Sequence, residues 1–243
     1  GAISYAVSEG TCTLNTAVLT PGDAGSVCKV RVTRAESANY NSLTSAPIVI
    51  TVTRATPTLG TLALSTKTFG DSAFALTGPS ATYDSASVAG TWSYSSAQIS
   101  VATIEDSIAT VTGGGTSVIT ATFSPTDSVN FNSANTASTL TVEKATPTFS
   151  WTNVSATYGD ADFSIVSPTV ATTSATGTWT YSSANTSVAA ISGTKFDVLD
   201  AGTSVITATF TPANTTNYVS GGTITMTVTV DTANQTTLTI SSV

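Results

Sequence analysis

Histidine is absent from this chain of 243 residues, and cysteine, methionine and charged side chains are scarce. Without histidine, the commonest general base and the commonest metal ligand are missing, and a Ser-His-Asp triad cannot be built. Only 9% of the residues are charged, yet no apolar run approaches the roughly 18 residues that span a bilayer. We therefore expect no enzymatic activity, no catalytic residue, no cofactor, no metal site and no membrane-spanning segment.

Basic residues are also few. Seven Lys and Arg residues stand against 14 Asp and Glu residues, which gives a net charge of −7. Nucleic acids and anionic membranes attract basic patches, and this composition predicts neither partner. The densest acidic pair, Asp160-Ala161-Asp162, is interpreted as part of a solvated turn, because calcium needs about six to eight oxygen ligands.

What the sequence contains in abundance is internal repetition. Trp92-Ser93-Tyr94-Ser95-Ser96 recurs as Trp179-Thr180-Tyr181-Ser182-Ser183, 87 positions later (179 − 92). The segment from Thr116 to Phe123 recurs without change at 203–210, again 87 positions later (203 − 116). Matches that keep one order and nearly one spacing predict a tandem array of a single structural unit.

The repeats also predict domain boundaries. Arg54-Ala55-Thr56-Pro57-Thr58 recurs as Lys144-Ala145-Thr146-Pro147-Thr148 and opens each complete unit. A partial copy at the front aligns Ile3-Ser4-Tyr5 with Trp92-Ser93-Tyr94 and lacks the strands that precede this motif in the other copies. The predicted domains are an N-terminally incomplete repeat 1–53, complete repeats 54–143 and 144–230, and a tail 231–243 that resembles the first strand of a further repeat.

Within each unit the apolar residues alternate with period two. Ile224-Thr225-Met226-Thr227-Val228-Thr229-Val230 places apolar side chains on one face and Thr on the other, the pattern of a half-buried strand. Turn signals such as Phe69-Gly70-Asp71 and Tyr158-Gly159-Asp160 separate these runs. Short strands, frequent turns and about ninety residues per unit predict an all-β chain of tandem immunoglobulin-like β-sandwiches, arranged as an extended array.

Large aromatic side chains at equivalent places in the units are candidate core anchors, because one such ring supplies much of the core of a small domain. These residues are Trp92, Trp179, Tyr40, Phe131 and Tyr218. Trp151 has no counterpart in the second unit. It is the candidate ligand contact, although burial is the interpretation that we favour for it.

Cys12 and Cys28 are the only cysteines. An even count in an extracellular chain favours a disulfide, with a pair of free buried thiols as the alternative. Closing a loop of about 15 residues would stabilise the fold by roughly 3 kcal/mol in the chain-entropy model. The effect would matter most in the incomplete front repeat.

The third unit also shows a family resemblance. Its segments Ser155-Ala156-Thr157-Tyr158-Gly159-Asp160, Gly177-Thr178-Trp179-Thr180-Tyr181 and Ala201-Gly202-Thr203-Ser204-Val205 are followed by Asn217-Tyr218. This order resembles the bacterial immunoglobulin-like repeats, of the Big and YGX types, in very large surface and secreted proteins. The resemblance implies an extracellular stalk, spacer or adhesive array, and it offers no catalytic residue. The second unit departs from it by having Phe69 in place of a tyrosine.

Two hypotheses about function follow. The first is a structural stalk, spacer or filament segment of a large bacterial surface protein, whose partners are neighbouring repeats or copies of itself. In this hypothesis the tail 231–243 adds as a strand to the incomplete front repeat of another copy. A plainer interpretation is that the sequence is a window cut from a longer array. The alternative function is an adhesin module that binds a surface glycan or a protein through loops at the sandwich ends.

Overall fold

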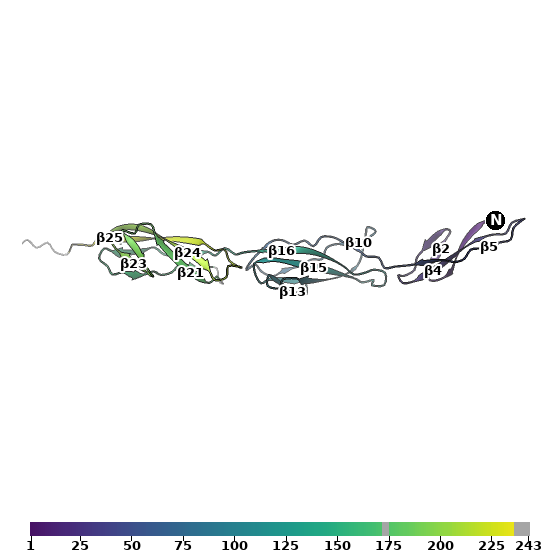
Figure 1. The fold of residues 1–243 in the computed structure, drawn as a ribbon, viewed down its shortest axis with the longest axis horizontal. Helices are drawn as coiled ribbons and strands as arrows, with labels where there is room; N and C mark the ends of the chain where they lie inside the picture. Colours follow the sequence, from purple (N-terminus) through teal and green to yellow (C-terminus); the bar gives the residue numbers. More distant parts are fainter. Residues whose placement is uncertain (172–174, 236–243) are drawn as a thin grey trace, which may run out of the picture. The chain divides into compact units, whose positions relative to one another are not determined.

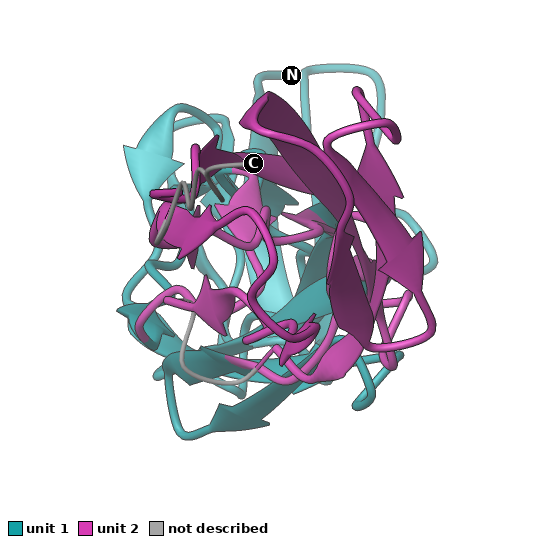
Figure 2. Cartoon of the chain, turned by 90° about the vertical axis from the view of Figure 1, so that its left-hand side faces the viewer, with its two compact units in different colours: residues 1–65, 73–110, 117–140 teal, residues 66–72, 111–116, 141–243 magenta. Residues whose placement is uncertain are grey.

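The structure is a computed structural model that describes residues 1–171 and 175–235. Every regular element in these residues is a β-strand, and no helix occurs among them (Figure 1). The prediction of an all-β fold is therefore confirmed. The described chain divides into two compact units (Figure 2): unit 1 comprises residues 1–65, 73–110 and 117–140, and unit 2 comprises residues 66–72, 111–116 and 141–243.

The predicted domain boundaries stay a prediction, and we use them to name the first repeat (1–53), second repeat (54–143) and third repeat (144–230). The first repeat forms a four-stranded sheet and a separate hairpin. In the sheet, β4 (Val27–Arg34) pairs with β1 (Ile3–Glu9), β5 (Leu43–Thr44) and β6 (Ile48–Thr51). The hairpin consists of β2 (Thr13–Asn15) and β3 (Val18–Thr20).

The predicted alignment of Ile3-Ser4-Tyr5 with Trp92-Ser93-Tyr94 is wrong by two residues. Trp92 pairs with Phe123, whereas the residue that aligns with Phe123, Val32, pairs with Tyr5. Tyr5 rather than Ile3 therefore stands at the place of Trp92. Side chains of a strand alternate with period two, so a shift of two residues leaves the same side chains on the same face. The sequence pattern alone cannot distinguish these two registers.

The second and third repeats contain the same sheet twice. A strand with the Trp-x-Tyr motif pairs with a long strand, which pairs with a second long strand, and a short early strand adds in parallel at the far edge. In the second repeat these strands are β12 (Gly90–Ser96), β15 (Gly115–Pro125), β16 (Ala134–Glu143) and β8 (Lys67–Thr68). In the third they are β21 (Gly177–Ser183), β24 (Gly202–Pro212), β25 (Gly222–Asp231) and β18 (Val154–Thr157).

Shorter strands form further small sheets in each repeat. In the third repeat, a small sheet consists of β19 (Phe163–Ser164), β22 (Ala189–Ser192) and β23 (Lys195–Val198). Its Phe196 packs with Ile206 and Val228 of the large sheet in one buried cluster. Two faces that share one core make a β-sandwich. The other shorter strands of the third repeat are β17 (Phe149–Ser150) and β20 (Thr169–Val170). Those of the second are β7 (Thr58–Leu59), β9 (Phe74–Ala75), β10 (Ala81–Tyr83), β11 (Ala86–Ser87), β13 (Ala102–Glu105) and β14 (Ile108–Val111).

The repeated segment Thr-Ser-Val-Ile-Thr-Ala-Thr-Phe explains why the two cores match. In β24 its alternate residues Ser204, Ile206, Ala208 and Phe210 are all at most 2% exposed. The buried serine would be costly without partners. The hydroxyl oxygen of Ser204 lies 2.8 Å from that of Ser183 and accepts the backbone N–H of Asn185 at 3.0 Å. The same arrangement occurs in the second repeat around Ser117.

Candidate functional site

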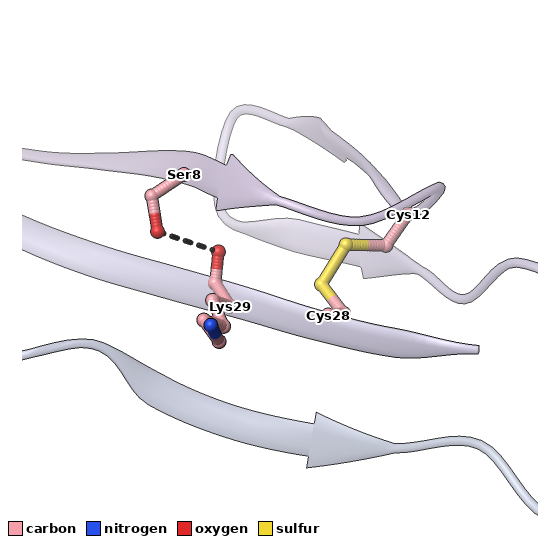
Figure 3. Close-up of a disulfide and its surroundings, with 4 residues drawn as sticks. All are labelled: Ser8, Cys12, Cys28 and Lys29. Carbon is pink, nitrogen blue, oxygen red and sulfur yellow. Dashed lines mark hydrogen bonds between the residues drawn. A yellow bond between two sulfur atoms is a disulfide. The ribbon is translucent and has the colours of Figure 1, made fainter.

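The two cysteines form a disulfide, as predicted. Cys12 lies in the segment after β1 and Cys28 lies in β4, with 5.9 Å between their Cα atoms (Figure 3). Beside the bridge, the Ser8 hydroxyl donates to the carbonyl of Lys29 at 3.2 Å. Cys12 and Cys28 are the only buried apolar residues in 1–53, a range that the structure describes in full. The disulfide therefore takes the place of a hydrophobic core in the first repeat.

Four of the five candidate core anchors pack against other rings. Trp92 and Trp179 are half-buried, and each lies against a fully buried phenylalanine, with ring centroids 5.1 Å and 4.9 Å apart. Tyr218 is 4% exposed, and the half-buried Phe131 packs edge-on against Tyr83 at 5.7 Å.

Tyr40 does not fit this prediction. Its side chain is 76% exposed, so the expectation that it anchors a core is wrong. The reason is visible at its counterpart Tyr218, whose ring meets Phe69 of the repeat before it at 5.4 Å. The ring of Tyr40 is not covered in this way, as its exposed fraction shows. Tyr40 therefore belongs to no core.

Trp151 lies at the edge of the third repeat. Its indole N–H donates to the carbonyl of Val166 at 2.6 Å, and its ring packs on Tyr181 at 5.8 Å between centroids. The half-buried ring also contacts the buried cluster around Phe196 and lines a cleft of about 350 Å³. A ligand contact at Trp151 stays a prediction, but both the polar atom and one face of the ring already have partners within the repeat.

A second candidate site is the junction around Asn217, where a loop of the third repeat contacts the second repeat. All of its residues belong to unit 2. The side-chain oxygen of Asn217 accepts the backbone N–H of Gly114 at 2.9 Å, and its carbonyl accepts the N–H of Ala145 at 2.9 Å. Val219 N–H donates to the carbonyl of Ala145 at 3.0 Å. A Cβ on Gly114 would lie 2.5 Å from the Thr216 carbonyl oxygen, so the approach of this loop requires glycine there.

The same junction is built a second time around Asn130, entirely within unit 1. The side-chain oxygen of Asn130 accepts the backbone N–H of Ala24 at 2.8 Å, and its amide donates to the Asp23 carboxylate at 3.1 Å. The carbonyl of Asn130 accepts the N–H of Ala55 at 2.8 Å, and Asn132 N–H donates to the Ala55 carbonyl at 2.8 Å.

The two junctions share one design. An asparagine that precedes an aromatic residue reaches a backbone N–H in a turn of the repeat before it, while the linker alanine pairs with the loop backbone as an isolated parallel bridge. The pair recurs in the sequence as Asn130-Phe131 and Asn217-Tyr218, but the sequence alone assigns the asparagine no role. The signal that pointed to it was recurrence of a polar residue beside a repeated aromatic, at the same spacing as the core strands.

The Asn130 junction contains a carboxylate that the Asn217 junction lacks. Hydrogen bonds from the side-chain amide and then the backbone N–H of Asn130 hold the pKa of Asp127 below its ordinary value of 3.8. A carboxyl group whose pKa falls on folding stabilises the fold while ionised, and this contribution is lost as the pH drops through the lowered pKa. Asn214, which does not titrate, accepts the equivalent loop hydrogen bonds in the third repeat.

We therefore expect acid to loosen the Asn130 loop and to leave the Asn217 loop unchanged. The measurement is the amide-exchange protection of Phe131 and Tyr218, followed from about pH 5 to below about pH 3.8. Protection at Phe131 should fall while that at Tyr218 holds. Asp127→Asn should remove this acid response. Equal acid responses at Phe131 and Tyr218 would contradict the assignment.

Among the described residues, no group of three or more metal-binding side chains comes together, and no helix is long and apolar enough to cross a membrane. No protein family and no curated protein matches the sequence. Among solved structures, the chain is similar to a Drosophila N-cadherin EC1-4 fragment, with 13% identity, a TM-score of 0.34, and coverage of 95% of this chain and 66% of that one.

Two other solved structures are similar to the chain at comparable levels. Domains 1-6 of surface layer protein SbsC share 15% identity and a TM-score of 0.32, with 96% of this chain and 35% of that one covered. The titin domains z1z2, solved in complex with telethonin, share 16% identity and a TM-score of 0.34, with 75% and 100% covered. The chain thus spans less than two thirds of the first two structures, and similarity this low assigns no function. The fold defines the class: tandem immunoglobulin-like β-sandwich repeats.

Proposed function

We propose that this chain is a structural segment of an extracellular bacterial protein, in which immunoglobulin-like repeats act as a stalk or spacer. The observation that carries the proposal is the junction built twice, around Asn130 and around Asn217. Each junction uses side-chain and backbone hydrogen bonds, so it fixes one repeat against the next instead of leaving a free linker. A spacer needs such defined joints, whereas a string of independent binding modules does not.

The disulfide supports an extracellular location, because such bonds persist in oxidising compartments. The linkers support a stiff joint, since the buried prolines Pro57 and Pro147 each restrict the backbone two residues after the alanine that pairs with the loop. Binding of a glycan or protein at the sandwich ends remains the alternative function.

The finer form of the proposal is self-association into filaments. In the version suggested by the sequence, tail residues 231–243 add a strand to the first repeat of another copy. Residues 236–243 lie outside the described part of the chain. Removal of the tail tests this version, because a chain ending at residue 230 should then fail to assemble.

The spacer proposal predicts that Asn130 restricts the motion of the first repeat against the second. Nitroxide labels on Val49→Cys and Thr91→Cys, both exposed, would report this distance by pulsed electron spin resonance. We expect a narrow distance distribution in the parent chain and a broader one in Asn130→Ala, because the alanine leaves the Ala24 N–H without its partner. Asn15→Ala, in the β2–β3 hairpin, is the matched control and should leave the width unchanged. A parent distribution as broad as that of Asn130→Ala would refute the proposal.

A further inference from the structure

The third repeat carries the receiving half of this junction with no loop bound to it among the described residues. Asp200-Ala201-Gly202 repeats Asp23-Ala24-Gly25, the turn that holds Asn130 in the first junction. Tyr158 stands at the place of Phe69: its N–H donates to the Asp231 carbonyl at 2.8 Å, as that of Phe69 donates to the Glu143 carbonyl at 2.9 Å.

The linker alanine has a counterpart too. Ala145 follows Glu143 by two residues, and Ala233 follows Asp231 by two. Ala145 is 9% exposed because its N–H and carbonyl pair with the Asn217 loop, whereas Ala233 is exposed. The groups that would contact a loop are therefore present in the third repeat.

These groups surround a hollow. Tyr158, Asp200, Ala201 and Ala233 line a pocket of about 390 Å³, and the Tyr158 side chain is 51% exposed. The Ala201 N–H, which corresponds to the N–H that binds Asn130 or Asn217, donates instead to the Asp200 carboxylate at 2.8 Å. A side-chain oxygen of the repeat itself thus fills the place of the missing asparagine, and a polar donor in the hollow is kept satisfied.

The matching inserting half is exposed at the first repeat. Glu36-Ser37-Ala38-Asn39-Tyr40 aligns with Asp127-Ser128-Val129-Asn130-Phe131, and the Tyr40 ring is 76% exposed. Ser37 and Tyr40 exchange backbone hydrogen bonds of 2.9 and 3.1 Å, so the loop is already an ordered turn. Little conformational entropy would then be lost when it binds.

We propose that the hollow formed by Tyr158, Asp200, Ala201 and Ala233 binds the Asn39-Tyr40 loop of a second copy of this chain. The Asn39 side-chain oxygen accepts the Ala201 N–H in place of Asp200, and its amide donates to the released carboxylate, as Asn130 does with Asp23. Ala233 pairs with the loop backbone, and Tyr40 packs on Tyr158. This inference deepens the proposed function and rests on it, since it extends the same joint from within one chain to two copies.

Within the chain, a short linker holds each loop at an effective concentration in about the millimolar range. Two copies lack this linker, so we expect association that is weak and visible at high protein concentration. A few neutral hydrogen bonds and one ring contact do not support tight binding. Backbone amide shifts are suited to such an equilibrium because they report weak contacts residue by residue.

The experiment titrates dilute ¹⁵N-labelled chain with unlabelled parent chain. The Ala201 and Ala233 amides should shift with concentration as their hollow fills. When the unlabelled partner carries Asn39→Ala and Tyr40→Ala, the chemical shifts of these two amides should not change. The labelled Asn39 and Tyr40 amides should still shift, because the variant's own hollow is intact. This loop signal shows that the third repeat of the variant partner is folded.

Tyr158→Ala in the unlabelled partner should reverse this pattern, while Val166→Ala, also exposed on the third repeat, should match the parent. Absent shifts at Ala201, or equal shifts with the Asn39→Ala, Tyr40→Ala partner, would overturn the inference. A chain ending at residue 235 keeps the hollow and should associate like the parent; loss of association would overturn the inference in favour of strand addition by the tail. The spin-label test of the Asn130 junction is independent, so failure of the proposed function can be told apart from failure of this inference.

Discussion

Reduction of the Cys12–Cys28 disulfide is expected to unfold the first repeat while the third repeat stays folded. The two cysteines are the only buried apolar side chains in residues 1–53, and large apolar side chains such as Ile3, Val18 and Ile48 are exposed there. A sheet with so small a core cannot offset the entropy of ordering its chain, which is why small domains need covalent links. Breaking the bridge restores conformational entropy to this loop in the unfolded state, which lowers the free energy of unfolding by about 3 kcal/mol.

Amide exchange locates the effect. With reductant, protection in β1 and β4 should fall by about 100-fold, since 1.4 kcal/mol corresponds to a factor of about ten. Protection in β24 and β25 should not change, because the third repeat has its own core around Ile206 and Val228. A chain with Cys12→Ala and Cys28→Ala should show the low protection of the reduced protein, and this protection should be the same with and without reductant. Unchanged protection in β4 after complete reduction would show that the sheet is stable without the bridge.

The fold was largely predictable because its signals are local and repeated. Alternation along residues 224–230 and the identical segments 116–123 and 203–210 predicted strands, and the structure buries the alternate residues of both segments. Strand register was predictable only where a large side chain pins it. Trp92 and Trp179 pair with Phe123 and Phe210 in the same register, whereas the exposed β1 lacks such an anchor, and its alignment was wrong by two residues.

The candidate site was predictable only in part. The disulfide followed from the cysteine count, because no other thiol competes for either partner. The exposure of Tyr40 did not follow, since its counterpart Tyr218 is covered in part by Phe69, 149 positions away (218 − 69) in another repeat. The role of Asn217 was hidden for a similar reason: its partner is a backbone N–H, a group that every residue except proline carries, so no side chain in the sequence marks it.

Phe210→Ala is expected to have the largest effect of any single core substitution in the third repeat, a loss of about 3 to 5 kcal/mol in the free energy of unfolding. Phe210 is 1% exposed, and its ring lies 4.9 Å from Trp179 and 5.3 Å from Phe149 between centroids. A Cβ built on Gly177 would come within 2.7 Å of the ring, so even the facing backbone is in close contact. Removing the ring from walls made of paired strands leaves a cavity that cannot easily collapse.

Urea denaturation followed by circular dichroism, with amide exchange in β24 to assign the transition, measures this loss. Phe210→Leu retains most of the volume and should cost less than about 1.5 kcal/mol. Val205→Ala is the matched control: it lies in the same strand, on the opposite face and 45% exposed, so it should change stability by no more than about 0.5 kcal/mol. The same cluster contains Tyr218 of the junction, so Phe210→Ala should also reduce protection at Tyr218. If Phe210→Ala and Val205→Ala cost the same, the buried aromatic cluster does not hold the third repeat together, and the junction cannot depend on it.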